Sequence, residues 1–488
     1  MEKNMKRFVT YILIGLAVLS VSACEDFLEK GPKLSQSTDL VLSSYDGLNK
    51  ATLGAYARLG NVGWYGGERV LESEMRSGNG IKHIDHNSNR YMTQMNWNYL
   101  PEATSGMWAT GYVTIAACNN VIDNLEGKES SEVSAQDLNN LKAECLFLRA
   151  LCHFDIVTLF ALPYTYVKNN GNSLKDNQKL GIPYVYHTDS EARPAREPVL
   201  TVYENIVNDL LEAEKIIDPS YVRSGVADTK AVVTLPVIQA FLSRVYLYMG
   251  EWQKSADYAT KVINSGKYTL YKPEEYTKVW TGNTGGSEVI FENFIDLGNL
   301  SNEDCSYMTY PEGAYGDCIC SPELYNLYED GDVRKDLYRQ DSNETEGLWW
   351  TLKYEGKGTG TPDASNTVIL RLSEMYLNRA EAIVRGATVA GTDAVKDLNL
   401  LMKNRNASQY NAVGVDAIQT ERRKELAWEG HYFFDLARWN KGVTRGSCYG
   451  MDVKYQNIPF PDYKWALPIP KRELNVNENL VQNDGYKE

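Results

Sequence analysis

The chain has 488 residues, a formal net charge of −14 and a charged fraction of 23%. Its length allows two or three domains or one large helical body, and its acidity argues against nucleic acid or an anionic membrane surface as the main partner. Five histidines and eight cysteines without a Cys-x-x-Cys pair do not suggest a zinc site, and no cofactor is expected.

The N-terminus has the pattern of an export signal. Basic residues precede the uncharged stretch 8–23, which is shorter than the roughly 20 residues of a membrane-spanning helix. Cys24 follows small residues at the expected cleavage position. We therefore predict a lipoprotein signal peptide over 1–23 and lipidation of Cys24 by acyl chains such as palmitate, which would anchor the mature protein. An ordinary signal peptide with a coincidental cysteine is the alternative.

The first half of the mature chain predicts helices around one long irregular segment. Residues 24–37 are a polar tether, and apolar residues recur at helical spacing over 38–60. The segment 61–106 is rich in Gly, Asn, Ser and aromatic residues, and loops of that length are usually functional. Helical periodicity returns over 107–125 and 135–160.

A connection over 161–198 leads to a further helix over 199–217. Thr201 with Glu204 three residues later suggests an N-cap at Thr201. His153, inside the preceding apolar helix, is interpreted as a satisfied core residue. Cys145 and Cys152, in the same helix, are interpreted as small core residues.

The strongest pattern is a helical hairpin over 232–266. Small residues mark the contact between its two helices and Gly250 separates them, as in a tetratricopeptide-like pair. A second pair fits 369–385 with 392–404. The sequence therefore predicts a mainly α fold, a scaffold of about four tetratricopeptide-like helical pairs.

The region 267–365, between these pairs, predicts an irregular, loop-rich subdomain on the scaffold. One disulfide among Cys305, Cys318 and Cys320 is an open possibility. A helix is predicted over 417–439, and the tail 440–488 is expected to be mostly loop.

Several segments, in order, resemble the RagB/SusD family of surface lipoproteins. They are the lipobox Cys24 with Glu25–Leu28, the helix Trp108-x3-Tyr112-x2-Ile115-x3-Asn119, the hairpin Ala240–Tyr268, Leu370–Ala382, Glu421–Leu436 and the tail Leu467–Asn483. His431 stands where the family commonly has arginine, and Glu478 where it commonly has proline. The resemblance implies N-terminal and C-terminal SusD-like helical regions over 38–266 and 366–488.

The resemblance also implies a function. Such proteins are non-catalytic, bind oligosaccharides at the cell surface and cover a SusC-like TonB-dependent outer-membrane transporter. Their ligand site usually draws on regions that here correspond to 61–106 and 280–350. The family therefore implies a surface-exposed, lipid-anchored protein of the outer membrane that takes part in nutrient uptake and polysaccharide utilisation.

Aromatic residues in irregular segments are the candidate ligand-binding residues, because a sugar can lie on a flat ring while polar groups bind its hydroxyls. Packing within loops is the alternative for each ring taken singly. The strongest candidates are Trp97, Tyr310 and Tyr315, followed by Trp64 and Tyr307; Tyr65, Tyr99, Trp349 and Trp350 belong to the same set.

Glu425 and Glu429 suggest the competing hypothesis of a glycosidase, because glycosidases use two carboxyl groups about 5 Å or 6.5–9.5 Å apart. Basic residues are interleaved with these acids, so we interpret them as ion pairs between helices, and paired carboxylates are poor general acids. A surface glycosidase, a SusD-like binder of another nutrient such as oligopeptides, and a purely structural lid are the alternatives to a glycan binder.

Overall fold

The computed structural model describes residues 38–84, 88–226, 228–280, 286–295, 305–309, 314–340, 348–355 and 365–487. The predicted signal peptide, the tether and Cys24 lie outside the described residues.

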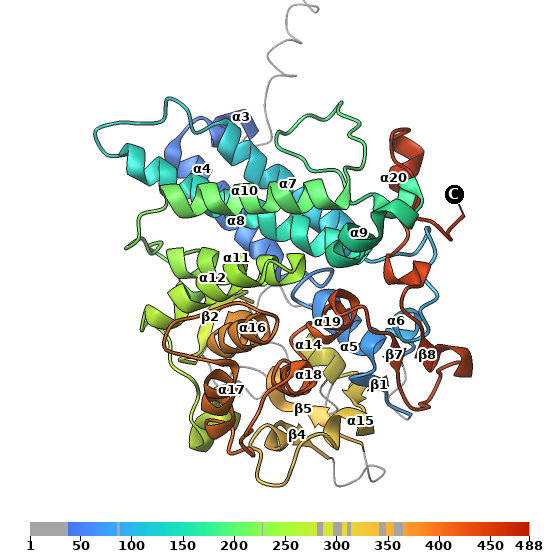
Figure 1. The fold of residues 1–488 in the computed structure, drawn as a ribbon. Helices are drawn as coiled ribbons and strands as arrows, with labels where there is room; N and C mark the ends of the chain where they lie inside the picture. Colours follow the sequence, from blue (N-terminus) through green and yellow to red (C-terminus); the bar gives the residue numbers. More distant parts are fainter. Residues whose placement is uncertain are drawn as a thin grey trace, which may run out of the picture.

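Helices packed in series form the scaffold. Each of the principal helices contacts the next in the order α4, α7, α8, α10, α11, α12, α16, α17, and in Figure 1 this series runs from the top of the molecule towards the bottom. Their bounds, with the short α3 that precedes them, are α3 Thr38–Leu42, α4 Tyr45–Ala57, α7 Met107–Asp123, α8 Ala135–Phe160, α10 Val199–Ile216, α11 Leu235–Met249, α12 Trp252–Asn264, α16 Leu372–Val384 and α17 Ala394–Lys403. The mainly α, tetratricopeptide-like scaffold is confirmed.

The predicted hairpin is the pair α11 and α12. Gly250 ends α11 with a φ of +70°, a left-handed conformation that glycine adopts without steric cost. The hydroxyls of Ser243 and Ser255 each donate a hydrogen bond to the other residue's carbonyl, at 3.0 and 2.9 Å. These reciprocal bonds hold the two helices at close range where small side chains meet.

Helix α8 runs through the centre of the scaffold and carries the buried histidine. Burial lowers the pKa of His153 to about 3, so the ring is neutral at pH 7. Its Nδ1 lies 2.9 Å from the carbonyl of Arg149, and its Nε2 accepts a hydrogen bond from the Val185 N–H at 3.1 Å. Both ring nitrogens are therefore satisfied, as predicted, and Cys145 and Cys152 are buried core residues.

Helix α10 begins at residue 199, as predicted, but its N-cap is not Thr201. Its first residue is Val199 and Pro198 occupies the N-cap position, so Thr201 lies inside the first turn and does not cap the helix. Pro198 has the extended backbone typical of the residue before a helix, with φ −54° and ψ 142°. The proline ring restricts φ to values near this one.

The helix predicted over 417–439 is two helices, α18 (Val415–Glu425) and α19 (Tyr432–Arg438). Between them Trp428 and Gly430 have φ of +64° and +79°. A Cβ at residue 430 would lie 3.0 Å from the carbonyl oxygen of Arg69, so glycine permits this close approach. The turn places the Trp428 ring in a core cluster that includes Val70 and Leu71 of helix α5 (Glu68–Ser77).

The segment 61–106, expected to be irregular, contains α5 (Glu68–Ser77), the strand β1 (Gly80–Lys82) and the short helix α6 (Met92–Met95). Nearly all of α5 is buried, charged side chains included. Arg69 pairs with Asp155 of α8 at 3.0 Å, and Arg76 pairs with Glu72 at 3.4 Å. The many charged residues of this segment suggest an exposed loop, but partners such as these compensate the charges when the helix is buried.

The region 267–365 consists of short elements. They are α13 Tyr276–Trp280, β2 Val289–Glu292, α14 Cys305–Thr309, β3 Cys318–Cys320, α15 Pro322–Tyr325, β4 Tyr338–Arg339 and β5 Trp350–Thr351. The strand β2 pairs antiparallel with β6 (Val368–Arg371), β1 with β3, and β4 with β5. Outside this region lie α9 Tyr164–Asn170, the β7–β8 pair Val443–Thr444 with Asn457–Ile458, and α20 Lys471–Val476.

Candidate functional site

The two segments in which the ligand site was expected lie side by side. The strand β1, from 61–106, pairs antiparallel with β3, from the region after the central hairpin, and Gly80 lies opposite Cys320. The Cys320 N–H also donates a hydrogen bond to the Trp349 carbonyl, at 2.8 Å. We call the residues around these strands, 80–84, 88–90, 307, 314–320 and 348–350, the β1–β3 junction.

A buried ion pair holds the junction together. The Lys82 ammonium lies 2.7 Å from a carboxylate oxygen of Asp317, and both side chains are almost fully buried. The backbone N–H of Ser88 donates to the same carboxylate, at 3.1 Å from Oδ2. One carboxylate thus binds both the strand β1 and the loop that follows it.

In the loop after β1, Arg90 contacts Tyr315. The guanidinium carbon of Arg90 lies 4.0 Å from the centre of the Tyr315 ring, and Nη2 donates a hydrogen bond to the phenol oxygen at 3.3 Å. The Tyr315 N–H donates to the carbonyl of Tyr307 at 3.0 Å. All three side chains are half-buried, so each keeps part of its surface accessible to a ligand.

Trp349 and Tyr325 add a second pair of half-buried rings beside this group. Their ring centres are 3.9 Å apart and their planes differ by 10°. Tyr310 lies outside the described residues.

Trp64 and Trp97 are core residues, which corrects the expectation that their rings are accessible. Trp64 is fully buried and its indole N–H donates to Asp155 at 2.7 Å. Trp97 is 1% exposed, donates to the carbonyl of Arg76 at 3.1 Å and packs edge-on against the ring of Trp465 at 5.0 Å. Neither ring offers a face to a ligand in this structure. Tyr65, Tyr99 and Trp350 are buried as well.

The carboxylates that suggested a glycosidase are locked in buried ion pairs. Glu425 accepts from Arg371 at 2.6 Å and lies 2.9 Å from Arg405 Nη2 and 3.3 Å from Arg334 Nη1. Glu429 pairs with Lys353 and with Arg371, each at 2.6 Å. Both acids are ion-paired, as predicted, but their partners come from other segments and not from the basic residues interleaved with them. Glu429 lies in the turn after α18 and not on that helix.

The charges around Glu425 also make it unsuitable as a general acid. Burial alone would raise the pKa of Glu425, but the guanidinium groups of Arg405, Arg371 and Arg334 outweigh burial and hold that pKa well below its usual range. The carboxylate therefore stays ionised and has no proton to donate at neutral pH.

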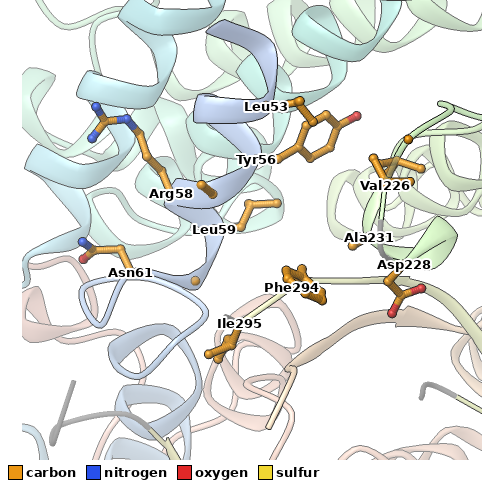
Figure 2. A pocket seen from close by; sticks show the side chains of 14 residues that line it. Leu53, Tyr56, Arg58, Leu59, Asn61, Val226, Asp228, Ala231, Phe294 and Ile295 are labelled. Carbon is orange, nitrogen blue, oxygen red and sulfur yellow. The ribbon is translucent and has the colours of Figure 1, made fainter. Parts of the chain in front are cut away.

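A cavity of about 540 Å³ lies at the C-terminal end of α4. Figure 2 shows Leu53 and Tyr56 along one wall, Val226, Asp228 and Ala231 opposite them, and Phe294 and Ile295 closing the cavity. Three of its polar groups already have partners within the protein. The Tyr56 hydroxyl donates to Glu144, and the Asp228 and Asn61 side chains accept from backbone N–H groups.

A second cavity, of about 420 Å³, was not anticipated from the sequence. Its lining comes from the segment 97–102 and from the C-terminal tail: Trp97, Asn98, Tyr99, Leu100, Pro101, Glu102, Tyr455, Tyr463, Lys464, Gly485, Tyr486 and Lys487. The tail aromatics lie in a stretch expected to be loop, with no pattern in the sequence to pair them with 97–102. We call this cavity the tail pocket.

Three further observations concern metal binding, disulfide bonds and membrane-spanning helices. Among the described residues, no group of three or more His, Cys, Asp or Glu side chains is arranged to hold a metal ion. The seven cysteines in the described ranges are all unpaired thiols. No single helix of the described chain has the length and apolarity to cross a membrane, and the bent pair 135–160 with 164–173 meets that test only by length and composition.

Comparison with known proteins adds family matches over most of the chain. Residues 26–247 match a family model described as starch-binding and associating with the outer membrane, and residues 335–486 match the SusD family model. The starch-binding protein SusD of Bacteroides thetaiotaomicron is 24% identical over 99% of this chain and 100% of its own length.

Solved structures agree with these matches. A SusD superfamily protein from Bacteroides thetaiotaomicron is 30% identical, with a TM-score of 0.77 over 90% of this chain and 99% of its own. A SusD superfamily protein from Bacteroides vulgatus is 27% identical, with a TM-score of 0.80 over 91% of this chain and 100% of its own.

Proposed function

The chain belongs to the SusD family, and we propose that it is a non-catalytic lipoprotein of the outer-membrane surface that captures a glycan. It then delivers the glycan to a SusC-like TonB-dependent transporter. The observation that carries the proposal is the β1–β3 junction, where Arg90, Tyr307, Tyr315 and Trp349 are only half-buried in the two segments expected to bind ligand.

The chemistry of the junction suits a sugar. A tyrosine or tryptophan ring offers an apolar face with a polar edge, and a guanidinium group offers several hydrogen-bond donors to hydroxyls. The starch-binding relative supports a glycan as the ligand class. Tyr310 is proposed as a further contact, on the basis of its position in the sequence.

Replacement of Tyr315 tests the site. We expect Tyr315→Ala to reduce retention in native affinity electrophoresis on the polysaccharide that retains the wild type, with about a tenfold loss of affinity, because the ring contact and the partner of Arg90 are removed together. Tyr315→Phe keeps the ring and should retain more binding. Tyr310→Ala belongs to the same series, and Tyr186→Ala, a partly exposed tyrosine outside the junction, is the control. Unchanged retention of both Tyr315 variants would remove the junction from the site.

Lipidation of Cys24 is tested by Cys24→Ser. The variant should lose acyl labelling and membrane retention, because no thiol remains to carry the lipid, while its affinity for glycan in solution stays that of the wild type. Membrane fractionation with labelled palmitate measures the acyl labelling and the membrane retention. Affinity electrophoresis measures the affinity for glycan. Continued membrane retention without labelling would contradict the anchor.

Binding of another nutrient remains the second candidate, and glycan hydrolysis the third. Incubation of a polysaccharide with the purified protein distinguishes binding from hydrolysis, because a binder releases no reducing sugar. Retention by oligopeptide and by none of a polysaccharide panel would favour the second candidate.

A further inference from the structure

We propose that the tail pocket is a second carbohydrate-binding site, which holds one sugar unit of a glycan. This inference rests on the proposed function, since it assumes a glycan ligand, but it concerns different residues. None of the residues that line the tail pocket belongs to the β1–β3 junction. Its volume of about 420 Å³ lies in the range of small-molecule sites.

Aromatic rings form one wall of the tail pocket. Tyr463 is 39% exposed and meets Tyr486 edge-on, with ring centres 5.1 Å apart and planes at 77°. Gly485 makes this arrangement possible, because a Cβ there would lie 2.4 Å from Cγ of Tyr463, and its φ of +86° suits glycine. Glycine at residue 485 thus lets the tail pack closely against the Tyr463 ring, and 39% of Tyr463 still remains exposed.

Lys464 adds a positive charge beside these rings. Its ammonium lies 5.1 Å from the centre of the Tyr455 ring and 5.5 Å from that of Tyr463. Within the described residues, this ammonium forms no ion pair with a carboxylate. It therefore retains hydrogen-bond donors for a ligand.

The 97–102 segment of the lining supplies an amide. Asn98 is exposed, and among the described residues its side chain has no hydrogen-bond partner. An amide both donates and accepts, so Asn98 can bind adjacent hydroxyls of a sugar. Nearby, Glu102 is already paired with Lys471 at 3.0 Å, whereas the lining residues Lys464 and Lys487 form no ion pair with a carboxylate of the described residues.

These features together define the ligand class. Flat ring faces favour the CH-rich face of a pyranose, while an amide and an ammonium bind hydroxyls at its edge. In the 540 Å³ cavity, by contrast, the Tyr56, Asp228 and Asn61 side chains already have partners within the protein.

The test compares Tyr463→Ala and Asn98→Ala with the wild type, each in the full mature chain carrying Cys24→Ser. Isothermal titration with maltohexaose, laminarihexaose and hexagalacturonate measures affinity for neutral and acidic glycans. We expect Tyr463→Ala to weaken binding of the recognised glycan about tenfold and Asn98→Ala to weaken it by a smaller factor. Circular dichroism should show unchanged helical content, since both side chains are exposed.

Tyr186→Ala is the matched control, because Tyr186 is also 39% exposed and packs against another tyrosine ring, that of Tyr184, at 4.9 Å. Suppose that the wild type binds a glycan and that Tyr463→Ala loses no more affinity for it than Tyr186→Ala does. This result would overturn the second site and leave the proposed function standing. A wild type that binds none of the three probes counts against the proposed function as well. Additive losses in the Tyr315→Ala/Tyr463→Ala double variant support two independent contacts with the glycan.

Discussion

Glu425→Gln is expected to lower the free energy of unfolding by about 3–5 kcal/mol, the usual cost of breaking a buried ion pair by removing one partner. The substitution removes a charge shared by Arg334, Arg371 and Arg405. All four side chains are almost fully buried, so water cannot replace the lost carboxylate. Urea unfolding followed by circular dichroism measures the change.

Glu126→Gln is the matched control for Glu425→Gln. It makes the same chemical change at an exposed position, where substitutions usually alter stability by less than about 0.5 kcal/mol. Equal unfolding midpoints for the two variants would show that the network contributes little.

The same Glu425 variant bears on catalysis. Release of reducing sugar by the wild type that disappears in a folded Glu425→Gln protein would overturn the non-catalytic proposal. We expect no release by either protein, because the carboxylate is held ionised by three arginines.

Trp97→Ala is expected to lower the free energy of unfolding by about 3–5 kcal/mol, as is typical of a large aromatic removed from a core. The ring packs against Phe433 and Trp465, and the Arg76 guanidinium lies 4.6 Å from its centre. Its loss leaves a cavity and removes the hydrogen bond to the Arg76 carbonyl. Thermal and urea unfolding both measure the effect.

Trp252→Ala is the control for Trp97→Ala, because Trp252 is only half-buried, on the surface of α12. We expect this substitution to lower the free energy of unfolding by less than Trp97→Ala does. A Trp97→Ala protein with wild-type stability and weakened glycan retention would instead restore Trp97 as a ligand contact. The two measurements therefore separate a core role from a binding role.

Local patterns were sufficient for the helical scaffold. Periodicity and Gly250 predicted α11 and α12 to within a few residues, because a helix that buries one face has a repeat visible in the sequence. The sequence also predicted that Glu425 is ion-paired, but its partners Arg334, Arg371 and Arg405 come from other segments and not from the neighbouring basic residues.

Helix α5 could not be predicted in this way. Its charged residues are buried by partners distant in sequence, such as Asp155 for Arg69. The break between α18 and α19 has a similar origin, because Trp428 packs against α5 and its backbone adopts a φ that a helix excludes.

The amino-acid pattern alone was enough to assign the family, the helical scaffold and the two segments whose aromatic residues favour a glycan. The tertiary structure decided which of those rings are accessible. Trp64 and Trp97 are core residues, while Tyr307 and Tyr315 are half-buried at the β1–β3 junction. Exposure depends on contacts between segments far apart in the chain, such as Trp97 with Trp465 or Tyr463 with Tyr486, and irregular segments carry no periodicity that would reveal those contacts.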